Sequence, residues 1–414
     1  MNKAINFLEK NTDAWEIFNA KEHLKILKIE NNKIKSVNEG LEEGYAVRVV
    51  VNGKLGFASG NDLIEACKNA IKIARISEEK IDEFAFSRHK KAEGIYDRKF
   101  EESDNWMLES ADIVLNTISE FGCVANSTIE AGKSEVRIVN SSGLDCYEIS
   151  TSFGGLVEVV KDDSSSYEIQ ESRKMDVDFE WITRKAARLT LDGLKAVKLN
   201  KGIYDVVLSP IAVHQLLFFA LYPAFSAENF LKGRSALKIG DEVGEITIID
   251  DGKLKSGLFT SSFDDEGIDT KKTVVVGKGM FKSFLTDFKY SLELGVDATG
   301  NCYREELSSY PTIAPTNVVL DFKDKFELDE LNGDKILEVH AFIGSHTSNP
   351  VSGDFSLECM NAVLTKDRIP IKTAMIYGNV YEFLRKIEGF GKDVRQFENT
   401  VTPSILFKDV VVSG

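Results

Sequence analysis

The amino-acid sequence predicts an α+β fold in which helices lie over antiparallel sheets and a strand-rich half follows. Three observations predict it. Residues 23–60 alternate apolar and polar side chains between turn residues, which is typical of hairpins with one buried face. Residues 63–74 carry apolar side chains at helical spacing. Beyond residue 246, short β-branched segments are separated by Gly or Asp-Asp turns, which is typical of strands.

The first half of the chain predicts helices packed on hairpins. Asn52-Gly53 fits a tight hairpin turn, and Asn61 or Asp62 can cap the helix that begins at Leu63. Residues 1–18 have roughly helical spacing, and residues 85–105 show no clear period and predict a loop. The remaining expectations are a helix at 107–121, strands over 127–173 and a helix at 181–197 that includes Leu194 and Val197. Turns are expected at Gly132-Lys133, 141–143 and 161–166. We take residues 1–200 as one domain.

The second half, residues 201–414, predicts a strand-rich domain. A short buried strand precedes Pro210, which is well placed in the first turn of the next helix, and that helix is almost entirely apolar. A core position for this helix is favoured over an interface position. The β-branched strand segments that follow lie at 246–252, 272–288, 317–322, 335–344 and 403–412.

Composition narrows the class of protein. The chain has 414 residues with 51 Lys and Arg against 66 Asp and Glu, giving a formal charge of -15. Such a charge repels phosphate backbones and anionic membranes, so neither nucleic acid nor a membrane is expected as a partner. The opening residues lack the apolar centre of a signal peptide, and we expect a cytoplasmic protein. The five cysteines are dispersed, which favours reduced packing residues over disulfides.

The apolar helix that begins at Pro210 contains a histidine, and a glutamate follows it. Histidine and glutamate are the residue types that a zinc hydrolase carries on its catalytic helix. A metallopeptidase helix needs two histidines on one face beside a glutamate. His214 has no second histidine near it, and Glu228 follows Pro223, which is expected to end or kink the helix. His214 is therefore interpreted as a partly buried histidine with ordinary partners.

Several polar segments sit where strands should end. Asp264, Asp265 and Glu266 are adjacent and could bind a hard cation, but a solvated turn is favoured, as it is for Asp250-Asp251-Gly252. His340 lies in an expected strand, and neither it nor His346 belongs to a recognised metal motif. The other polar residues selected at strand ends are Thr299, Asn301, Asn317 and Asp354.

Taken in order, these segments resemble the TldD/PmbA family, also called the modulator of DNA gyrase family. The resemblance spans nearly the whole chain. It is carried by VNSSGLD at 139–145, VVLSP at 206–210, ITIIDDG at 246–252, FDDEG at 263–267, TGNCYRE at 299–305, APTN at 314–317 and GDFS at 353–356.

The resemblance implies a two-domain fold and a function in peptide processing. Active members carry H-E-x-x-x-H on the helix after the VVLSP-like strand and take a further zinc ligand from a later cysteine. Here the motif falls at Phe218–Pro223, and no cysteine follows Cys359. This departure indicates the PmbA/TldE branch, whose members have no zinc motif and act as partners of a TldD-like subunit.

On that basis we expect no catalytic residue, no metal ligand and no cofactor in this chain, with zinc held by a TldD-like partner in a heterodimer. A peptide substrate can be held on exposed strand edges. The selected turn residues are then candidates for the cleft or the subunit contact. Two alternatives stay open. One is an autonomous hydrolase that uses His340, His346, Asp354 and Asp265, and the other is a homodimeric peptide-binding scaffold.

Overall fold

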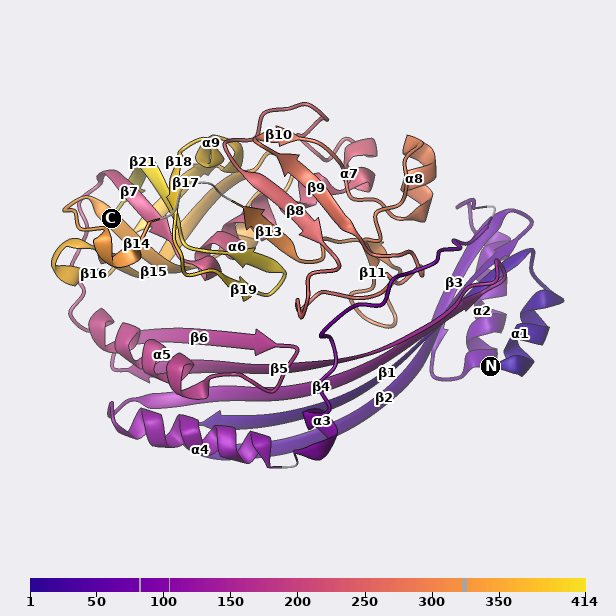
Figure 1. Cartoon of the computed structure of the whole chain (residues 1–414), viewed down its shortest axis with the longest axis horizontal. Coiled ribbons are helices and arrows are strands. Elements are labelled where there is room, and N and C mark those ends of the chain that lie inside the picture. Colours follow the sequence, from indigo (N-terminus) through magenta and orange to yellow (C-terminus); the bar gives the residue numbers. More distant parts are fainter. Residues whose placement is uncertain (82, 104, 322–325) are drawn as a thin grey trace.

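The computed structural model describes residues 1–414 except 82, 104 and 322–325. Its first half is a long antiparallel sheet in the order β3-β2-β1-β4-β5-β6, and its second half is strand-rich, so the predicted α+β class is confirmed. Figure 1 shows the second half lying over one face of the long sheet, with helices α4 and α5 on the opposite face. The strands of this sheet are β1 (Ala14–Glu30), β2 (Lys33–Val51), β3 (Lys54–Gly60), β4 (Val124–Asn140), β5 (Asp145–Lys161) and β6 (Ser164–Ser172).

Two-residue turns fix the register of this sheet. Asn31-Asn32 joins β1 to β2, and the predicted Asn52-Gly53 turn joins β2 to β3. All four turn residues have positive φ, between 50° and 70°. Such turns match the right-handed twist of the flanking strands, and Asn and Gly are the residues that tolerate them best.

The helices of the first half cover the sheet with their apolar stripes. Asp62 caps α2, because its side chain accepts a hydrogen bond from the Glu65 backbone N–H at 3.0 Å. α2 packs on β2 and β3, whereas α4 and α5 pack together over β1, β4 and β5. The helices are α1 (Asn2–Glu9), α2 (Leu63–Ile76), α3 (Lys99–Glu102), α4 (Trp106–Ser119) and α5 (Phe179–Gly193).

Three local predictions for this half are wrong. The helical spacing of residues 1–18 corresponds to a helix only over α1, because Ala14–Phe18 already belong to β1. Gly132-Lys133 is not a turn, because β4 runs straight through it and is paired along its length with β1 and β5. Ladder hydrogen bonds on both sides outweigh the turn preference of one glycine. The last helix ends at Gly193, so Leu194 and Val197 lie outside it. Val197 instead forms a β-bridge with Ile371 of the second half.

The second half contains a seven-stranded sheet that closes on itself, because β14 pairs with both β7 and β15. The β7–β14 pair and the β13–β20 pair are parallel, which the sequence did not predict. The strands of the closed sheet are β7 (Gly202–Leu208), β14 (Ile336–Ile343), β15 (Asp354–Leu364), β16 (Ile369–Ile371), β17 (Met375–Asn379), β18 (Ile387–Phe390) and β21 (Ile405–Ser413).

A second sheet, in the order β10-β9-β8-β13-β20-β19, packs beside the closed one. Its strands are β8 (Thr247–Asp251), β9 (Lys272–Gly277), β10 (Met280–Phe281), β13 (Val318–Asp321), β19 (Arg395–Phe397) and β20 (Thr400–Thr402). The remaining elements of this half are the strand pair β11 (Cys302–Tyr303) and β12 (Thr312–Ile313), the helices α6 (Pro210–Ala220), α7 (Ala227–Leu231), α8 (Phe288–Leu294) and α9 (Val380–Leu384), and 3-10 turns at Tyr222–Phe225, Leu328–Glu330, Ser345–Thr347 and Lys366–Arg368.

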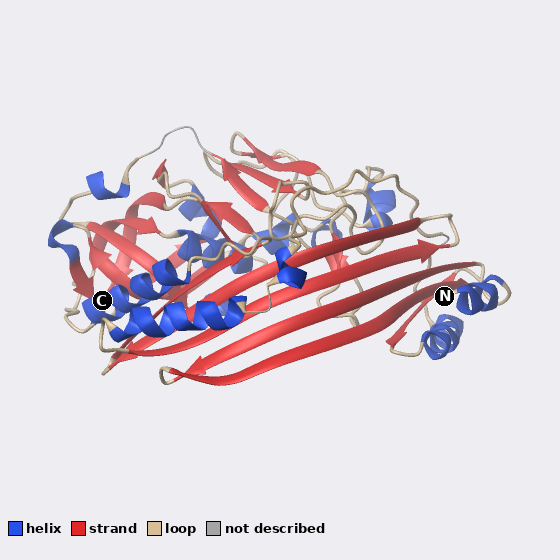
Figure 2. Cartoon of the chain, turned by 60° about the horizontal axis from the view of Figure 1, so that its bottom comes forward, coloured by secondary structure: helices blue, strands red, loops and turns tan. Residues whose placement is uncertain are grey.

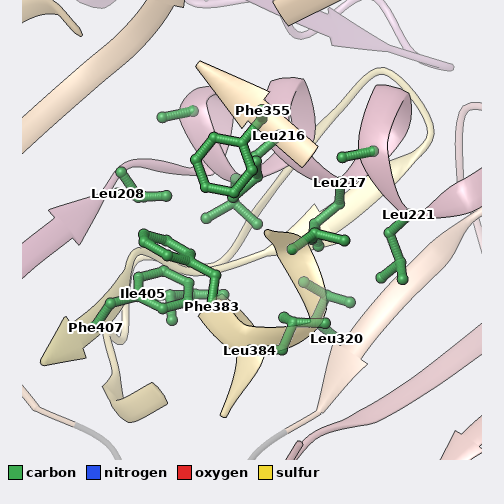
Figure 3. Packing of buried hydrophobic residues seen from close by; sticks show 14 of the residues in the cluster. Leu208, Leu216, Leu217, Leu221, Leu320, Phe355, Phe383, Leu384, Ile405 and Phe407 are labelled. Carbon is green, nitrogen blue, oxygen red and sulfur yellow. The ribbon is translucent and has the colours of Figure 1, made fainter. Parts of the chain in front are cut away.

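The largest apolar core of the chain surrounds α6. Leu216 and Leu217 of this helix pack among side chains of α9, β15 and β21, as Figure 3 shows. The core position predicted for this helix is therefore confirmed. Among the described residues, no helix is both long enough and apolar enough to cross a lipid bilayer.

Candidate functional site

The apolar helix α6 begins as the sequence predicted. The Ser209 side chain accepts a hydrogen bond from the Ala212 backbone N–H at 3.3 Å, and Pro210 occupies the first turn. The helix ends at Ala220, and Pro223 lies in the following 3-10 turn, since proline cannot donate a helix hydrogen bond. Glu228 lies beyond that turn in α7, as expected if Pro223 ends the helix. There it forms an ion pair with Lys232.

His214 is buried and uses both ring nitrogens. It is 3% exposed, its Nδ1 lies 2.9 Å from Thr400 Oγ1, and its Nε2 lies 3.2 Å from Glu398 Oε2. This contact with the histidine, helped by their charge attraction, holds the pKa of Glu398 below its usual range. The interpretation of His214 as a histidine with ordinary partners is confirmed, but the side chain is fully buried and not partly buried as expected.

Four positions on and just after α6 are only partly buried in a segment that is otherwise buried, namely Gln215, Phe218, Phe219 and Pro223. In the family resemblance given above, Phe218, Phe219 and Pro223 occupy the positions of the two histidines and the glutamate of H-E-x-x-x-H. Their side chains offer only carbon and hydrogen, and zinc in proteins is bound by nitrogen, sulfur or oxygen. The residues present therefore do not fit a zinc ion at this position.

The FDDEG segment is a turn but not a solvated one, so that part of the interpretation is wrong. Asp264 is fully buried and Glu266 is 4% exposed. Asp264 Oδ1 accepts the backbone N–H groups of Glu266 and Ile268, and its Oδ2 accepts that of Cys302 at 3.0 Å. Burial, followed by the nearby Glu266 charge, raises the pKa of Asp264 well above its usual value. The turn is held by its own carboxylate.

Arg48 of β2 joins this turn to the long sheet. Its Nη1 donates to Glu266 Oε1 at 2.7 Å, and its Nε and Nη2 donate to Glu16 Oε1 at 2.9 and 2.8 Å. Arg48 is 2% exposed and Glu16 is 1% exposed. Burial raises the pKa of Glu16, whereas the two carboxylates raise that of Arg48 despite its burial. One buried guanidinium thus bridges two segments more than two hundred residues apart.

Sequence reasoning missed Glu16 and Arg48. They are direct cross-strand partners in the β1–β2 pair. The available signal was a single charged residue inside each of two apolar runs, AWEIF and AVRVVV. A charge at a position where the strand is buried on both faces implies a charged partner, because an unpaired buried charge is too costly to retain. The pattern predicts a partner but does not identify it.

Further charged groups surround the bridge. Asp265 Oδ2 accepts the Arg304 backbone N–H at 2.7 Å, and the Arg304 guanidinium lies over the Phe18 ring at 4.9 Å. Burial raises the pKa of Asp265 to about 6, although Arg304 opposes the shift. Burial and the Glu266 charge raise the pKa of Asp287, which caps α8, to about 7. Burial is the main cause of both shifts, because it disfavours the charged form of a carboxyl group.

Glu266, Asp287 and Cys302 each bring one potential metal-binding atom within 4.8 Å of the others. Glu266 already has Arg48 as a cationic partner at 2.7 Å, and its second oxygen accepts the Phe288 backbone N–H at 2.8 Å. Burial raises the pKa of the Cys302 thiol, which keeps it protonated at neutral pH. These partners favour a structural role for the cluster.

The Asp250-Asp251-Gly252 segment is also not a solvated turn. Asp250 lies in β8 and is 1% exposed, and it accepts hydrogen bonds from Thr316 and from the Asn301 side chain at 2.8 Å. Burial raises its pKa to about 6. Asn317 Nδ2 donates to the Asp251 carbonyl at 2.9 Å. These contacts explain why TGN and PTN occur with DDG, since the three segments share one buried hydrogen-bond network.

The remaining candidates lie in separate surroundings. Thr299 exchanges hydrogen bonds with Thr286 inside the chain. Asp354 is exposed and accepts from Asn379 and Ser352, which lower its pKa. His340 is buried against the Tyr167 carbonyl at 2.9 Å, whereas His346 is exposed. The structure therefore does not bring His340, His346, Asp354 and Asp265 together as one site.

Comparison with known proteins gives matches along nearly the whole chain. Residues 22–74, 74–194 and 201–414 match the family models described as PmbA/TldA metallopeptidase domain 1, central domain and C-terminal domain. An uncharacterized protein of Methanocaldococcus jannaschii is 33% identical, with 100% of both chains covered. A metalloprotease of the same organism is 24% identical and covers 94% of this chain and 89% of its own.

The fold has a close match among solved structures. The crystal structure of TldE from Thermococcus kodakarensis superposes with a TM-score of 0.92 at 24% identity, and all of both chains is covered. At that identity the likeness concerns the fold.

Proposed function

The chain belongs to the PmbA/TldD metallopeptidase family, and from that premise we propose that it is a non-catalytic, substrate-handling subunit of a peptidase complex. The family resemblance inferred from the sequence motifs is confirmed. The proposal adds that a TldD-like partner supplies the zinc and that this chain binds none. It places the complex in the cytoplasm, in line with the sequence-based expectation.

The loss of the metal-binding groups carries this proposal. Phe218, Phe219 and Pro223 replace those groups on and just after α6, and these three partly buried side chains are the apolar strip. An apolar strip can bind the side chains of an extended peptide while the backbone pairs with a strand edge. Such a strip binds substrate but cannot activate water.

The buried turn residues enter the proposal as positioning groups. Asp264, Glu266, Thr299, Asn301 and Asn317 are buried, so they would act by fixing the loops that form the cleft or the subunit contact. Asp265 lies with them and holds the loop of Arg304. Asp354 is exposed and would take part only at the surface. None of the seven is assigned a step in peptide hydrolysis.

The decisive experiment compares this chain alone with a mixture of it and the H-E-x-x-x-H paralogue from the same genome. We expect zinc and chelator-sensitive peptidase activity only when the paralogue is present, and we expect the two chains to co-purify. Chelator-sensitive cleavage by this chain alone would instead support the autonomous hydrolase. A stable homodimer that binds peptide but never associates with the paralogue would support the scaffold.

A substitution tests the apolar strip. Phe219→Ala in the mixed complex should raise KM for peptide and leave the zinc content unchanged, because it removes binding area and no ligand. Phe86→Ala is the matched control, since Phe86 is an exposed phenylalanine at 59% exposure in the loop that follows α2. Equal kinetics for both variants would argue against a role of the strip in substrate binding.

A further inference from the structure

Two glutamates flank a glycine on the face of the long sheet that lies toward the second half. Gly154 of β5 pairs with Glu130 of β4 on one side and with Glu171 of β6 on the other. Ile129 packs in the core with α4 and α5, and side chains alternate along a strand, so Glu130 and Glu171 point away from these helices. Figures 1 and 2 show the second half on that side of the sheet. Since Gly154 has no side chain, β5 places nothing between the two carboxylates.

A third carboxylate reaches the same place from the second half. Glu398 lies in the turn between β19 and β20, and the Glu171 carboxylate accepts a hydrogen bond from its backbone. Glu398 Oε2 lies 3.2 Å from His214 Nε2, and Gln396 Nε2 donates to the Glu398 carbonyl at 2.9 Å. These contacts hold Glu398 in place before any ligand binds, and a preorganised group loses less conformational freedom on binding.

These three glutamates form a recess, here called the acidic recess, that is open to solvent. The Glu398 side chain is 52% exposed, and Glu130 and Glu171 are also exposed. Desolvation by the surrounding protein, followed by the charges of Glu398 and Glu130, nevertheless raises the pKa of Glu171. A carboxylate that solvent reaches but protein partly desolvates lies between walls of protein and not on an open surface.

The two glutamates of the sheet lack a basic partner in the part of the chain that the structure describes. Neither Glu130 nor Glu171 forms an ion pair there, and Glu398 pairs only with His214. Lys28 lies on the same face of β1, but it forms no ion pair with them. Three carboxylates that face one another with one histidine between them attract a cation from outside the chain.

The spacing of the acidic recess favours a large cation over a metal ion. Within the described residues, potential metal-binding atoms come within 4.8 Å of one another only at Glu266, Asp287 and Cys302. The carboxylates of the acidic recess are therefore too far apart to surround one metal ion. An ammonium or guanidinium group carries several N–H donors and can contact carboxylates that lie further apart.

The acidic recess adjoins the apolar strip. His214, which contacts Glu398, lies against Phe218 one helical turn further along α6, with 5.1 Å between the ring centroids. Phe218 is the first residue of the strip. A peptide on the strip can therefore place a neighbouring side chain at the acidic recess.

We propose that the acidic recess selects peptides in which a lysine or arginine lies next to an apolar residue. This rests on the function proposed above and names the substrate class for that site. The basic side chain donates hydrogen bonds to the carboxylates while its apolar neighbour contacts the strip. Hydrogen bonds between charged groups are roughly twice as strong as neutral ones, and complementary charge contributes mainly to specificity.

The test measures peptide binding by this chain alone, so it depends neither on a partner nor on zinc. A short labelled peptide carries Phe-Arg-Leu at its centre, and two matched peptides carry glutamine or glutamate in place of the arginine. Fluorescence anisotropy should give a Kd for the arginine peptide about tenfold lower than that for the glutamine peptide. The glutamate peptide should bind most weakly.

Variants connect the preference to the acidic recess. Glu171→Gln should remove most of the preference for arginine and leave the affinity for the glutamine peptide unchanged, because it removes charge and keeps shape. Glu171→Lys should shift the preference to the glutamate peptide. Glu109→Gln is the matched control, because Glu109 is an exposed glutamate of α4 on the opposite side of the sheet, and it should change nothing. Thermal unfolding of each variant checks that it is folded.

Three results would overturn the proposal. They are equal affinity for the three peptides, a loss of preference in Glu109→Gln as large as in Glu171→Gln, and displacement of the arginine peptide by Mg²⁺ at constant ionic strength. The second would indicate general attraction by the negative net charge, and the third would assign the recess to a metal ion. A chain that prefers arginine but never associates with the paralogue keeps the recess and loses only the peptidase complex. Co-purification without any preference does the reverse.

Discussion

Replacing Arg48 with methionine tests the idea that one buried guanidinium couples the long sheet to the second half of the chain. Its nitrogens lie 2.7–2.9 Å from Glu16 and Glu266, and all three residues are at most 4% exposed. Removal of one partner from a buried ionic cluster leaves charge uncompensated, which costs about 3–5 kcal/mol. We expect Arg48→Met to lower the free energy of unfolding by that amount.

The assay is equilibrium unfolding in urea, followed by both far-UV circular dichroism and intrinsic fluorescence. Two probes are needed because a chain of this size can unfold through intermediates. Arg137→Met is the control, because Arg137 also pairs with a carboxylate through Nε and Nη2, which donate to the two oxygens of Asp145 at 2.9 and 2.8 Å, but it does so at the surface. That variant should lose about 1 kcal/mol or less.

A combined variant separates the charge effect from the loss of packing. Adding Glu16→Gln and Glu266→Gln to Arg48→Met removes the uncompensated carboxylates, so most of the lost stability should return. The reasoning is refuted if Arg48→Met costs no more than Arg137→Met. It is also refuted if the combined variant is less stable than Arg48→Met alone.

Three further predictions concern protonation, packing and backbone conformation. The pKa of Asp287 is raised to about 7 in the folded chain. The stability that its protonated form contributes is therefore complete at a pH below the ordinary pKa of aspartate, and it is lost as the pH rises through 7. Thermal unfolding should therefore show a stability that falls from pH 5 to pH 8. The Asp287→Asn variant can still cap α8 and should make this fall with pH smaller. An unchanged dependence on pH would contradict the assignment to Asp287. Leu217→Ala in the core around α6 should cost about 2–5 kcal/mol in urea unfolding, whereas a cost below about 1 kcal/mol would mean that α6 is not central to that core. Gly300→Ala should destabilise the chain more than Gly53→Ala. Both glycines have positive φ, but a Cβ atom at Gly300 would lie 2.6 Å from the Asp269 carbonyl oxygen, whereas one at Gly53 would meet open space. Equal melting temperatures of the two variants would contradict this prediction.

Much of the local structure could be predicted because its causes are local. The Asn52-Gly53 turn, the Asp62 cap and Pro210 at the start of α6 each depend on residues within a few positions. The apolar character of α6 indicated a core helix. The missing donor atoms at Phe218, Phe219 and Pro223 are a property of the sequence alone.

Local patterns failed where long-range pairing decided the outcome. Gly132 and Lys133 have turn-like sequence, but β4 lies between two strands of similar length, so extension satisfies their backbone groups on both sides. The parallel β7–β14 pair joins segments more than a hundred residues apart, and no local signal identifies such a partner.

The sequence alone determined which apolar strand segments carry a single charge, and that Phe218, Phe219 and Pro223 offer no zinc-binding atoms. Only the tertiary structure decided that Glu16, Arg48 and Glu266 meet, and that the acidic turns are buried. The physical reason is that desolvation makes a buried charge require a partner, but its identity depends on how distant strands pack. That packing is fixed by the whole chain.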